Sequence, residues 1–226
     1  MKNNIKYNSE IIEFLKTKYG CDFTIEKSGV EFNGNDGDYI HAFCKSAEYS
    51  DTFSVFCYPE SKRNGEKITI DNTEYIVCDE YAEVAFRNSL NEQISQLIGD
   101  DFLVRCQVEF SDYFISKSEY EKGMLDCLSN DQILSHITVY VIAPSNIDWN
   151  STISKVETYC ENFGAYRQYL YFATTTDCDM KAIEKDYLKN ADTFDSHMLE
   201  SKKIERIEFS LLKRGEGVTK RSVEKE

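Results

Sequence analysis

The sequence predicts an α+β fold, with a helix and an antiparallel β-meander packed on a long helix, followed by a β-α-β-α-β second half. Three patterns support this prediction. Between residues 79 and 98, apolar side chains recur three or four positions apart, as on one face of a helix. Across residues 103–110 they alternate with polar side chains, as in a strand with one buried face. Residues 136–213 then show the two periods in alternation.

The long helix is the element around which the first half is organised. Because an apolar stripe must be buried against another layer, we expect the flanking strands to cover it. Leu90 and Ile94 lie at the centre of the stripe, and Gln93 is predicted on the outer face. Gly99 supplies the left-handed residue that often ends a helix. The whole stripe comprises Tyr81, Val84, Ala85, Leu90, Ile94, Leu97 and Ile98.

A short helix and a series of strands precede the long helix. Ser9 is expected to cap the short helix and Gly20 to end it. Residues 33–38 and the pair Asn64-Gly65 are rich in Asn, Asp and Gly, so both are predicted hairpin turns. The buried face of the short helix is predicted to comprise Ile11, Phe14, Leu15 and Tyr19. The strands are predicted at residues 23–26, 39–45, 52–58, 67–70 and 74–78.

The second half begins with a helical connector, in which Ser118 and Glu121 have the spacing of a capping box. Its strands are predicted at residues 137–143, 167–173 and 206–212, and its helices at residues 149–163 and 176–187. The predicted organisation is therefore an α-β-β-β-β-α-β unit at 1–112, the connector at 113–135, a β-α-β-α-β unit at 136–213 and a flexible tail at 214–226.

Three short segments of the first half carry a resemblance to known sequences. They are the helix end Lys18-Tyr19-Gly20, the strand segment Phe56-Cys57-Tyr58-Pro59 and the helix start Asp79-Glu80-Tyr81. In this order they resemble a family of uncharacterised Gram-positive bacterial proteins, many of which are exported or lipid-anchored. The resemblance covers the first half and, more weakly, residues 120–143. It implies a helix before a β-meander, and it supplies no activity, cofactor or catalytic residue.

The charge of the chain limits its partners. The formal net charge is −14, so the surface is unsuited to nucleic acid, which is bound by clustered Lys and Arg. An anionic membrane is disfavoured for the same reason. A cationic protein partner fits better. No apolar run is long enough for a signal peptide or a membrane span, so we expect no membrane insertion and a cytoplasmic protein.

Two segments of the first half have the residue types of a metal site. His41-x-x-Cys44 offers imidazole and thiolate, which are good zinc ligands, but on a strand this odd separation places them on opposite faces. Residues 33–38 have the oxygen density of a calcium loop, but the required glycine and closing glutamate are out of position. We therefore expect a plain hairpin turn there and no bound metal.

The second half offers weaker candidates for chemistry. Asp177 and Asp179 follow a strand and could hold magnesium, although two carboxylates at a helix N-terminus explain them more simply. His136 and His197 have no recognisable partners in the sequence. Gly215-x-Gly217 follows a strand, but no helical pattern comes after it, as dinucleotide binding would require. We therefore assign no catalytic, cofactor-binding or metal-binding residue.

These observations favour an uncharacterised non-catalytic binding or protein-interaction module with an acidic surface. One alternative is a hydrolase or transferase whose site is assembled from distant residues, with Asp177 and Asp179 as candidates. Another is an envelope-exposed protein whose export signal lies upstream of the first methionine.

The cysteines provide the first testable prediction. The eight cysteines are widely spaced, form no Cys-x-x-Cys pair and mostly lie in apolar runs, as expected of reduced thiols in a core. Thiol titration of the denatured, unreduced protein should therefore return eight. A result of four or fewer would show that the chain folds in an oxidising compartment.

Overall fold

The computed structural model describes residues 7–33, 37–59, 65–110, 115–129, 134–144, 147, 149–163, 167–175, 204–213 and 217–224. The chain divides into two units. The first comprises residues 1–88 and 109–128, and the second comprises residues 89–108 and 129–226. Each unit contains one five-stranded sheet, so the predicted α+β class is confirmed.

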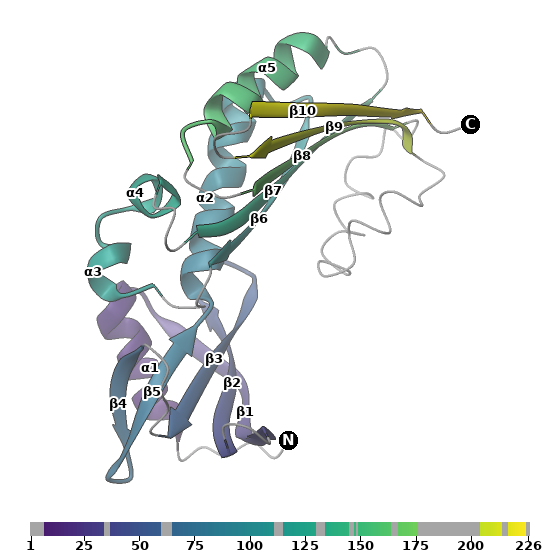
Figure 1. Ribbon diagram of the computed structural model, residues 1–226. Coiled ribbons are helices and arrows are strands. Elements are labelled where there is room, and N and C mark those ends of the chain that lie inside the picture. Colours follow the sequence, from purple (N-terminus) through teal and green to yellow (C-terminus); the bar gives the residue numbers. More distant parts are fainter. Residues whose placement is uncertain are drawn as a thin grey trace. The chain divides into compact units, whose positions relative to one another are not determined.

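The first unit is an antiparallel sheet with helices (Figure 1). Its strands lie in the order β1-β2-β3-β5-β4. They are β1 (Phe23–Asn33), β2 (Gly37–Ser46), β3 (Thr52–Pro59), β4 (Glu66–Ile70) and β5 (Thr73–Asp79). Its helices are α1 (Asn8–Tyr19), the first part of α2 (Tyr81–Ile98), α3 (Lys117–Tyr120) and α4 (Met124–Ser129).

The hairpins of this sheet follow the sequence prediction only in part. β1 and β2 pair around residues 33–38 as predicted, although residues 34–36 lie outside the described part. The hairpin predicted at Asn64-Gly65 is wrong, because the strands on either side of it, β3 and β4, are not neighbours in the sheet. β5 lies between them, and the turn Asp71-Asn72, with positive φ at both residues, joins β4 to β5. Five strands therefore precede α2, in agreement with the five predicted strand ranges, whereas the predicted order α-β-β-β-β-α-β counts only four.

Helix α1 packs against both edge strands of this sheet, β1 and β4. At its first turn the Ser28 hydroxyl of β1 donates to Asn8, and near its last turn Lys18 reaches Glu66 of β4. Gly20 ends the helix as predicted, with φ at 79° and its N–H bonded to the carbonyl of Lys16. The predicted Ser9 cap is wrong, since the helix begins at Asn8 with Tyr7 in the cap position, and the Ser9 hydroxyl donates to Glu10 instead.

The core of the first unit lies between these helices and one face of the sheet. β3 alternates between buried and half-buried residues, as a strand with one covered face does. The core side chains are Ile11 and Leu15 of α1, Phe23 of β1, Ile40, Ala42 and Cys44 of β2, Phe53, Val55 and Cys57 of β3, Ile70 of β4, Val77 of β5, and Tyr81, Val84 and Ala85 of α2. Of the predicted buried face of the short helix, Ile11 and Leu15 are therefore buried, and Phe14 and Tyr19 are partly buried against the same core.

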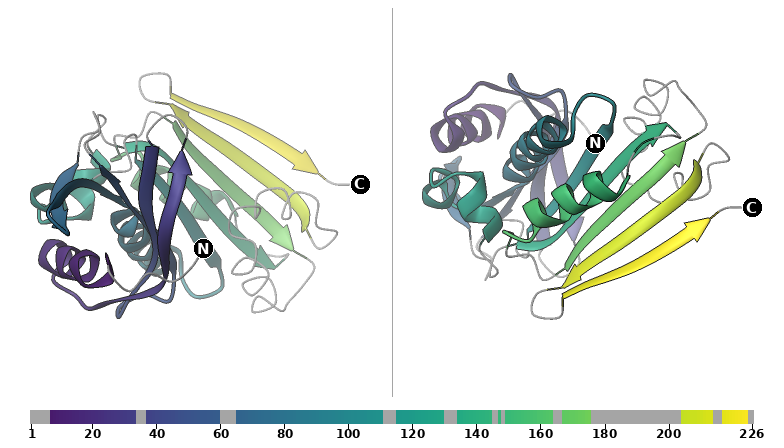
Figure 2. Two further views of the ribbon diagram at one scale, coloured as in Figure 1. Left: turned by 90° about the horizontal axis from the view of Figure 1, so that it is seen from below. Right: turned by 90° about the horizontal axis from the view of Figure 1, so that it is seen from above.

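The second unit is a mixed sheet in the order β10-β9-β8-β7-β6. β7 and β8 run parallel, and α5 connects them. Figure 2 shows α5 lying across this sheet. The elements are β6 (Leu103–Phe110), β7 (Leu134–Pro144), α5 (Trp149–Cys160), β8 (Arg167–Thr175), β9 (Ile204–Lys213) and β10 (Gly217–Glu224). The predicted helix at residues 176–187 lies outside the described residues.

Three local predictions in the second half need correction. β6 is the edge strand of the second sheet and does not complete the first unit. Residues 217–224 fall within the predicted flexible tail. They form β10, and each of them pairs with a residue of β9. The capping box is formed by Ser116 and Glu119, two residues earlier than the predicted Ser118 and Glu121.

Helix α2 contributes buried side chains to both units. Leu90 and Ile94 are completely buried, so the predicted centre of the stripe is confirmed. Gly99, with φ at 102°, donates its N–H to Ser95 and ends the helix. Gln93 does not lie on an outer face, because its side-chain oxygen accepts a hydrogen bond of 2.6 Å from the Tyr159 hydroxyl of α5.

The structure also bears on the cysteines and on the expected absence of a membrane span. The cysteines in the described part of the chain, seven of the eight, are free thiols, and all of these except Cys21 are buried. None of the helices within the described ranges combines the length and apolar character needed to cross a bilayer.

Removal of the buried side chains at the centre of α2 should unfold the protein or nearly so. Each Leu or Ile truncated to Ala in a core costs about 2–5 kcal/mol, against a typical domain stability of about 5–15 kcal/mol. We therefore expect the double variant Leu90→Ala, Ile94→Ala to lose cooperative unfolding in chemical denaturation. Gln96→Ala is the control, because Gln96 is exposed on the same helix. Equal midpoints for the two variants would contradict the assignment of the buried face.

Candidate functional site

The structure does not assemble a metal site from His41 and Cys44. Cys44 faces the core and is completely buried. The His41 ring contacts the rings of Phe43 and Phe56, with centroid distances of 4.3 and 4.5 Å, and its Nδ1 is 3.3 Å from a carboxylate oxygen of Glu31. Within the described ranges, no three His, Cys, Asp or Glu side chains gather as a metal would require. The absence of a bound metal stays a prediction.

Most of the other sequence candidates lie beyond the described residues. Asp177, Asp179 and His197 fall between residues 176 and 203, and the tip of the 33–38 turn is also outside. The His136 ring lies 6.1 Å from that of Tyr169. Gly217 begins β10, so a strand follows the Gly-x-Gly segment, where dinucleotide binding would require a helix.

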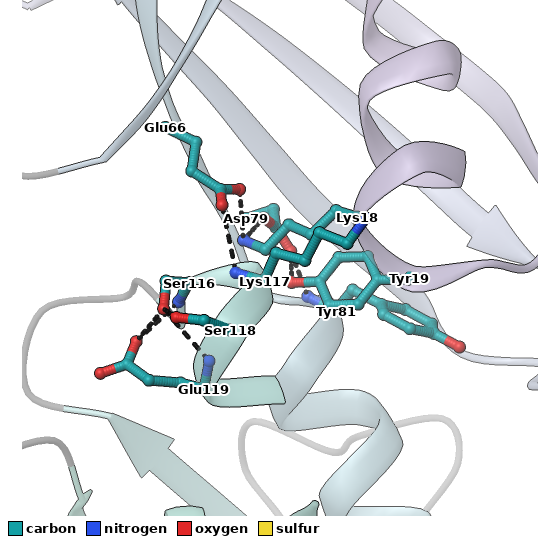
Figure 3. A network of polar contacts seen from close by, with 9 residues as sticks. All are labelled: Lys18, Tyr19, Glu66, Asp79, Tyr81, Ser116, Lys117, Ser118 and Glu119. Carbon is teal, nitrogen blue, oxygen red and sulfur yellow. Dashed lines mark hydrogen bonds and ion pairs between the residues drawn. The ribbon is translucent and has the colours of Figure 1, made fainter. Parts of the chain in front are cut away.

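The first unit contains a buried polar network that the sequence did not reveal (Figure 3). Its centre is the carboxylate of Asp79, the last residue of β5. One oxygen accepts a hydrogen bond of 2.9 Å from the Lys18 ammonium group. The other accepts from the Tyr19 hydroxyl at 2.6 Å and from the Tyr81 backbone N–H at 3.2 Å. The side chains of Lys18 and Asp79 are 1% and 0% exposed, so this ion pair is fully removed from water.

A second carboxylate extends the network toward the surface. Glu66 of β4 lies 3.6 Å from the Lys18 ammonium group and accepts the backbone N–H of Lys117 at 3.1 Å. Lys117 is the first residue of α3, whose N-terminus is fixed by the capping box of Ser116 and Glu119 (Figure 3). Glu66 therefore joins the end of α1 to the start of α3.

Aromatic rings enclose the inner side of the network. The ring of Tyr81 is 4.6 Å from that of Tyr19 and 4.9 Å from that of Phe23, and its hydroxyl donates to Glu48 at 2.8 Å. Burial and the neighbouring Asp79 carboxylate raise the pKa of the Tyr19 hydroxyl well above its usual value. Burial likewise raises the pKa of the Tyr81 hydroxyl, so both tyrosines are neutral hydrogen-bond donors at physiological pH.

A groove of about 390 Å³ lies beside the network, between α1 and β4. This volume falls within the range of about 300–1,000 Å³ found for small-ligand sites. The lining residues of α1 follow the spacing of a single helix face: Glu10, Glu13, Phe14, Thr17 and Lys18. The opposite wall is formed by Glu66, Lys67, Ile68 and Thr69 of β4, and Lys117 of α3 completes the lining.

Ion pairs within the protein neutralise the basic groups of this α1–β4 groove. Lys18 pairs with Asp79, Lys67 with Glu74, and Lys117 with Glu121 at 3.8 Å. Two of its carboxylates differ in this respect. Glu10 accepts a hydrogen bond from the Ser9 hydroxyl, and neither Glu10 nor Glu13 forms an ion pair with any residue in the described part of the chain. The unneutralised charge of the groove is therefore negative.

Glu83 of α2 is a further candidate, because a carboxyl group with a strongly shifted pKa often marks a catalytic site. Burial raises the pKa of Glu83 to about 7, and the nearby carboxylates of Glu80 and Glu109 act in the same direction. Glu83 accepts the backbone N–H of Phe110 at 3.1 Å. This bond ties the end of β6 to the first turn of α2, which is a structural role.

The network brings together two of the segments on which the family resemblance rests. Lys18-Tyr19 and Asp79-Glu80-Tyr81 are 61 residues apart in the chain, counted from Lys18 to Asp79, yet they form one cluster. One signal in the sequence could have revealed this. Lys18 stands three residues after Leu15 and seven after Ile11, on the buried face of the helix, where a cation requires a partner.

Comparison with known proteins supports the fold and supplies no activity. No family model and no curated protein matches the chain. Among solved structures, it is similar to a DUF5037 family protein from Ruminococcus gnavus ATCC 29149, with a TM-score of 0.58 and 14% sequence identity over 93% of each chain. At this identity the likeness shows a shared fold, and it is consistent with the resemblance to an uncharacterised family.

Loss of the Asp79 charge should destabilise the protein strongly. Asp79→Asn keeps an acceptor for Tyr19 and Tyr81 but leaves the Lys18 charge buried, and breaking a buried pair in this way costs about 3–5 kcal/mol. Chemical denaturation measures the loss. The double variant Lys18→Met, Asp79→Asn should recover part of it, because no unpaired charge then remains.

The control for this prediction is the exposed ion pair of Lys16 and Asp22, which lies near the same helix end. These two side chains are 62% and 76% exposed. Asp22→Asn should therefore unfold close to the wild-type midpoint. A similar loss for Asp22→Asn and Asp79→Asn would contradict the central role of the buried pair.

Proposed function

We propose that this protein is a non-catalytic binding module that holds a basic segment of a partner protein in the α1–β4 groove. The observation that supports the proposal is the charge of the groove. Its three lysines are neutralised within the protein, whereas Glu10 and Glu13 have no cationic partner among the described residues. The net charge of −14 for the whole chain would also attract a cationic partner.

The chemistry of the groove favours binding over catalysis. The Lys18 ammonium group is committed to Asp79, so it is not a free amine that could act as a nucleophile. Thr17 and Thr69 supply hydroxyl groups, and Phe14 and Ile68 supply apolar surface. Such a mixture of apolar walls and a few fixed charges is typical of a recognition site.

Peptide libraries test this proposal. One library of octapeptides carries Lys or Arg at every second position, and a matched library carries Glu or Asp there. The wild-type protein should select ligands from the basic library, and the tightest of them is then titrated by fluorescence anisotropy. Glu10→Lys with Glu13→Lys should weaken its binding by about tenfold or more, because attraction becomes repulsion.

The control variant carries Glu92→Lys and Glu161→Lys, which make the same change in net charge at two exposed residues of the second unit. It should bind the peptide as the wild type does, apart from a small loss of long-range attraction. Glu13→Lys alone, at an exposed position, provides a variant with an undisturbed helix start. Selection from both libraries alike, or equal losses in the groove and control variants, would refute the proposal.

A further inference from the structure

The α1–β4 groove runs along the edge of a strand. It is lined by four consecutive residues of β4, from Glu66 to Thr69. Successive side chains of a strand point to opposite faces of the sheet, so a cavity over one face would contact only every second residue. Contact with all four residues places the groove beside the strand, where its backbone groups are directed.

The backbone of β4 is suited to pair with a further strand. β4 is the last strand of the sheet, and its backbone pairs with β5 on one side. The β4–β5 register is regular throughout its five residue pairs, from Glu66 with Val77 to Ile70 with Thr73. The opposite edge differs, because β1 carries a bulge between Ile25 and Lys27, a device that protects edges from pairing.

From this geometry we infer that the basic segment binds as an added β-strand along the free edge of β4. The inference rests on the proposed function, and it specifies the conformation of the ligand and the backbone that holds it. β4 has five residues, so the paired part of the ligand spans about five residues, or roughly 16 Å. Backbone hydrogen bonds then give affinity in the manner of other strand-addition complexes.

The two walls of the groove define which side chains the added strand requires. Side chains on one face of the ligand point toward α1, where Glu13 favours a basic residue and Phe14 an apolar one. Side chains on the other face lie beside the exposed Lys67 and Thr69 and meet no such demand. The ligand is therefore expected to show a preference with a period of two, in which basic or apolar residues alternate with tolerant positions.

N-methylation of the selected basic octapeptide tests this inference. Each amide is methylated in turn, which removes one N–H donor and leaves the charge of the peptide unchanged. In an added strand only alternate N–H groups face β4, so methylation should weaken binding by roughly two- to tenfold at every second position of the paired part and little at the positions between. Anisotropy with the wild-type protein measures the series.

Hydrogen exchange supplies a second readout that does not depend on peptide chemistry. Binding should slow the exchange of the alternate β4 amides, within residues 66–70, that point away from β5, and leave the amides of the other edge strand, β1, unchanged. A peptide that binds with sensitivity to Glu10→Lys and Glu13→Lys, but shows no period-two methylation pattern and no protection of β4, would overturn strand addition and leave the proposed function intact. Failure of the basic octapeptide to bind would overturn both.

Discussion

The buried ion pair between Lys18 and Asp79 is the interaction on which the first unit depends. It joins the last turn of α1 to the end of β5, and the same carboxylate accepts the backbone N–H of Tyr81 at the start of α2. Three elements therefore meet at one anion. Two opposite charges out of water are tolerable only when their hydrogen-bonding capacity is satisfied. Lys18, Tyr19 and the Tyr81 N–H satisfy Asp79, and Glu66 lies next to Lys18 on its outer side.

This constraint also shapes the surface beside it. With Lys18 drawn inward, α1 is held against β4, and the groove between them retains the acidic side chains of the helix's first turns. Glu66 is shared between Lys18 and the N–H of Lys117, so α3 completes the groove on a fixed backbone. A binding site positioned by a rigid network in this way loses little side-chain freedom when a ligand arrives.

The long helix α2 has a different role, because its stripe is divided between the two units. Tyr81, Val84 and Ala85 belong to the core of the first unit, whereas Leu90 and Ile94 are buried in the second. Tyr81 serves both the core and the polar network, through its ring contacts and its backbone N–H. One continuous apolar period thus supports two sheets, which explains why it looks from the sequence like the centre of a single unit.

Local patterns in the sequence determined the elements of this protein. The apolar periods located α2, α5 and most strands, and Gly20 and Gly99 marked helix ends, because burial of one face and a left-handed stop are local requirements. Only the tertiary structure decided which strands are neighbours. β5 lies between β3 and β4, and β6 joins the second sheet. An alternating pattern indicates which face of a strand is buried, but it does not indicate which strand lies next to it. The candidate site was also decided by the tertiary structure. Glu10, Glu13 and the edge of β4 meet because α1 is anchored by Asp79, which is distant in the chain, and pairing over such a separation leaves no periodic trace in the sequence.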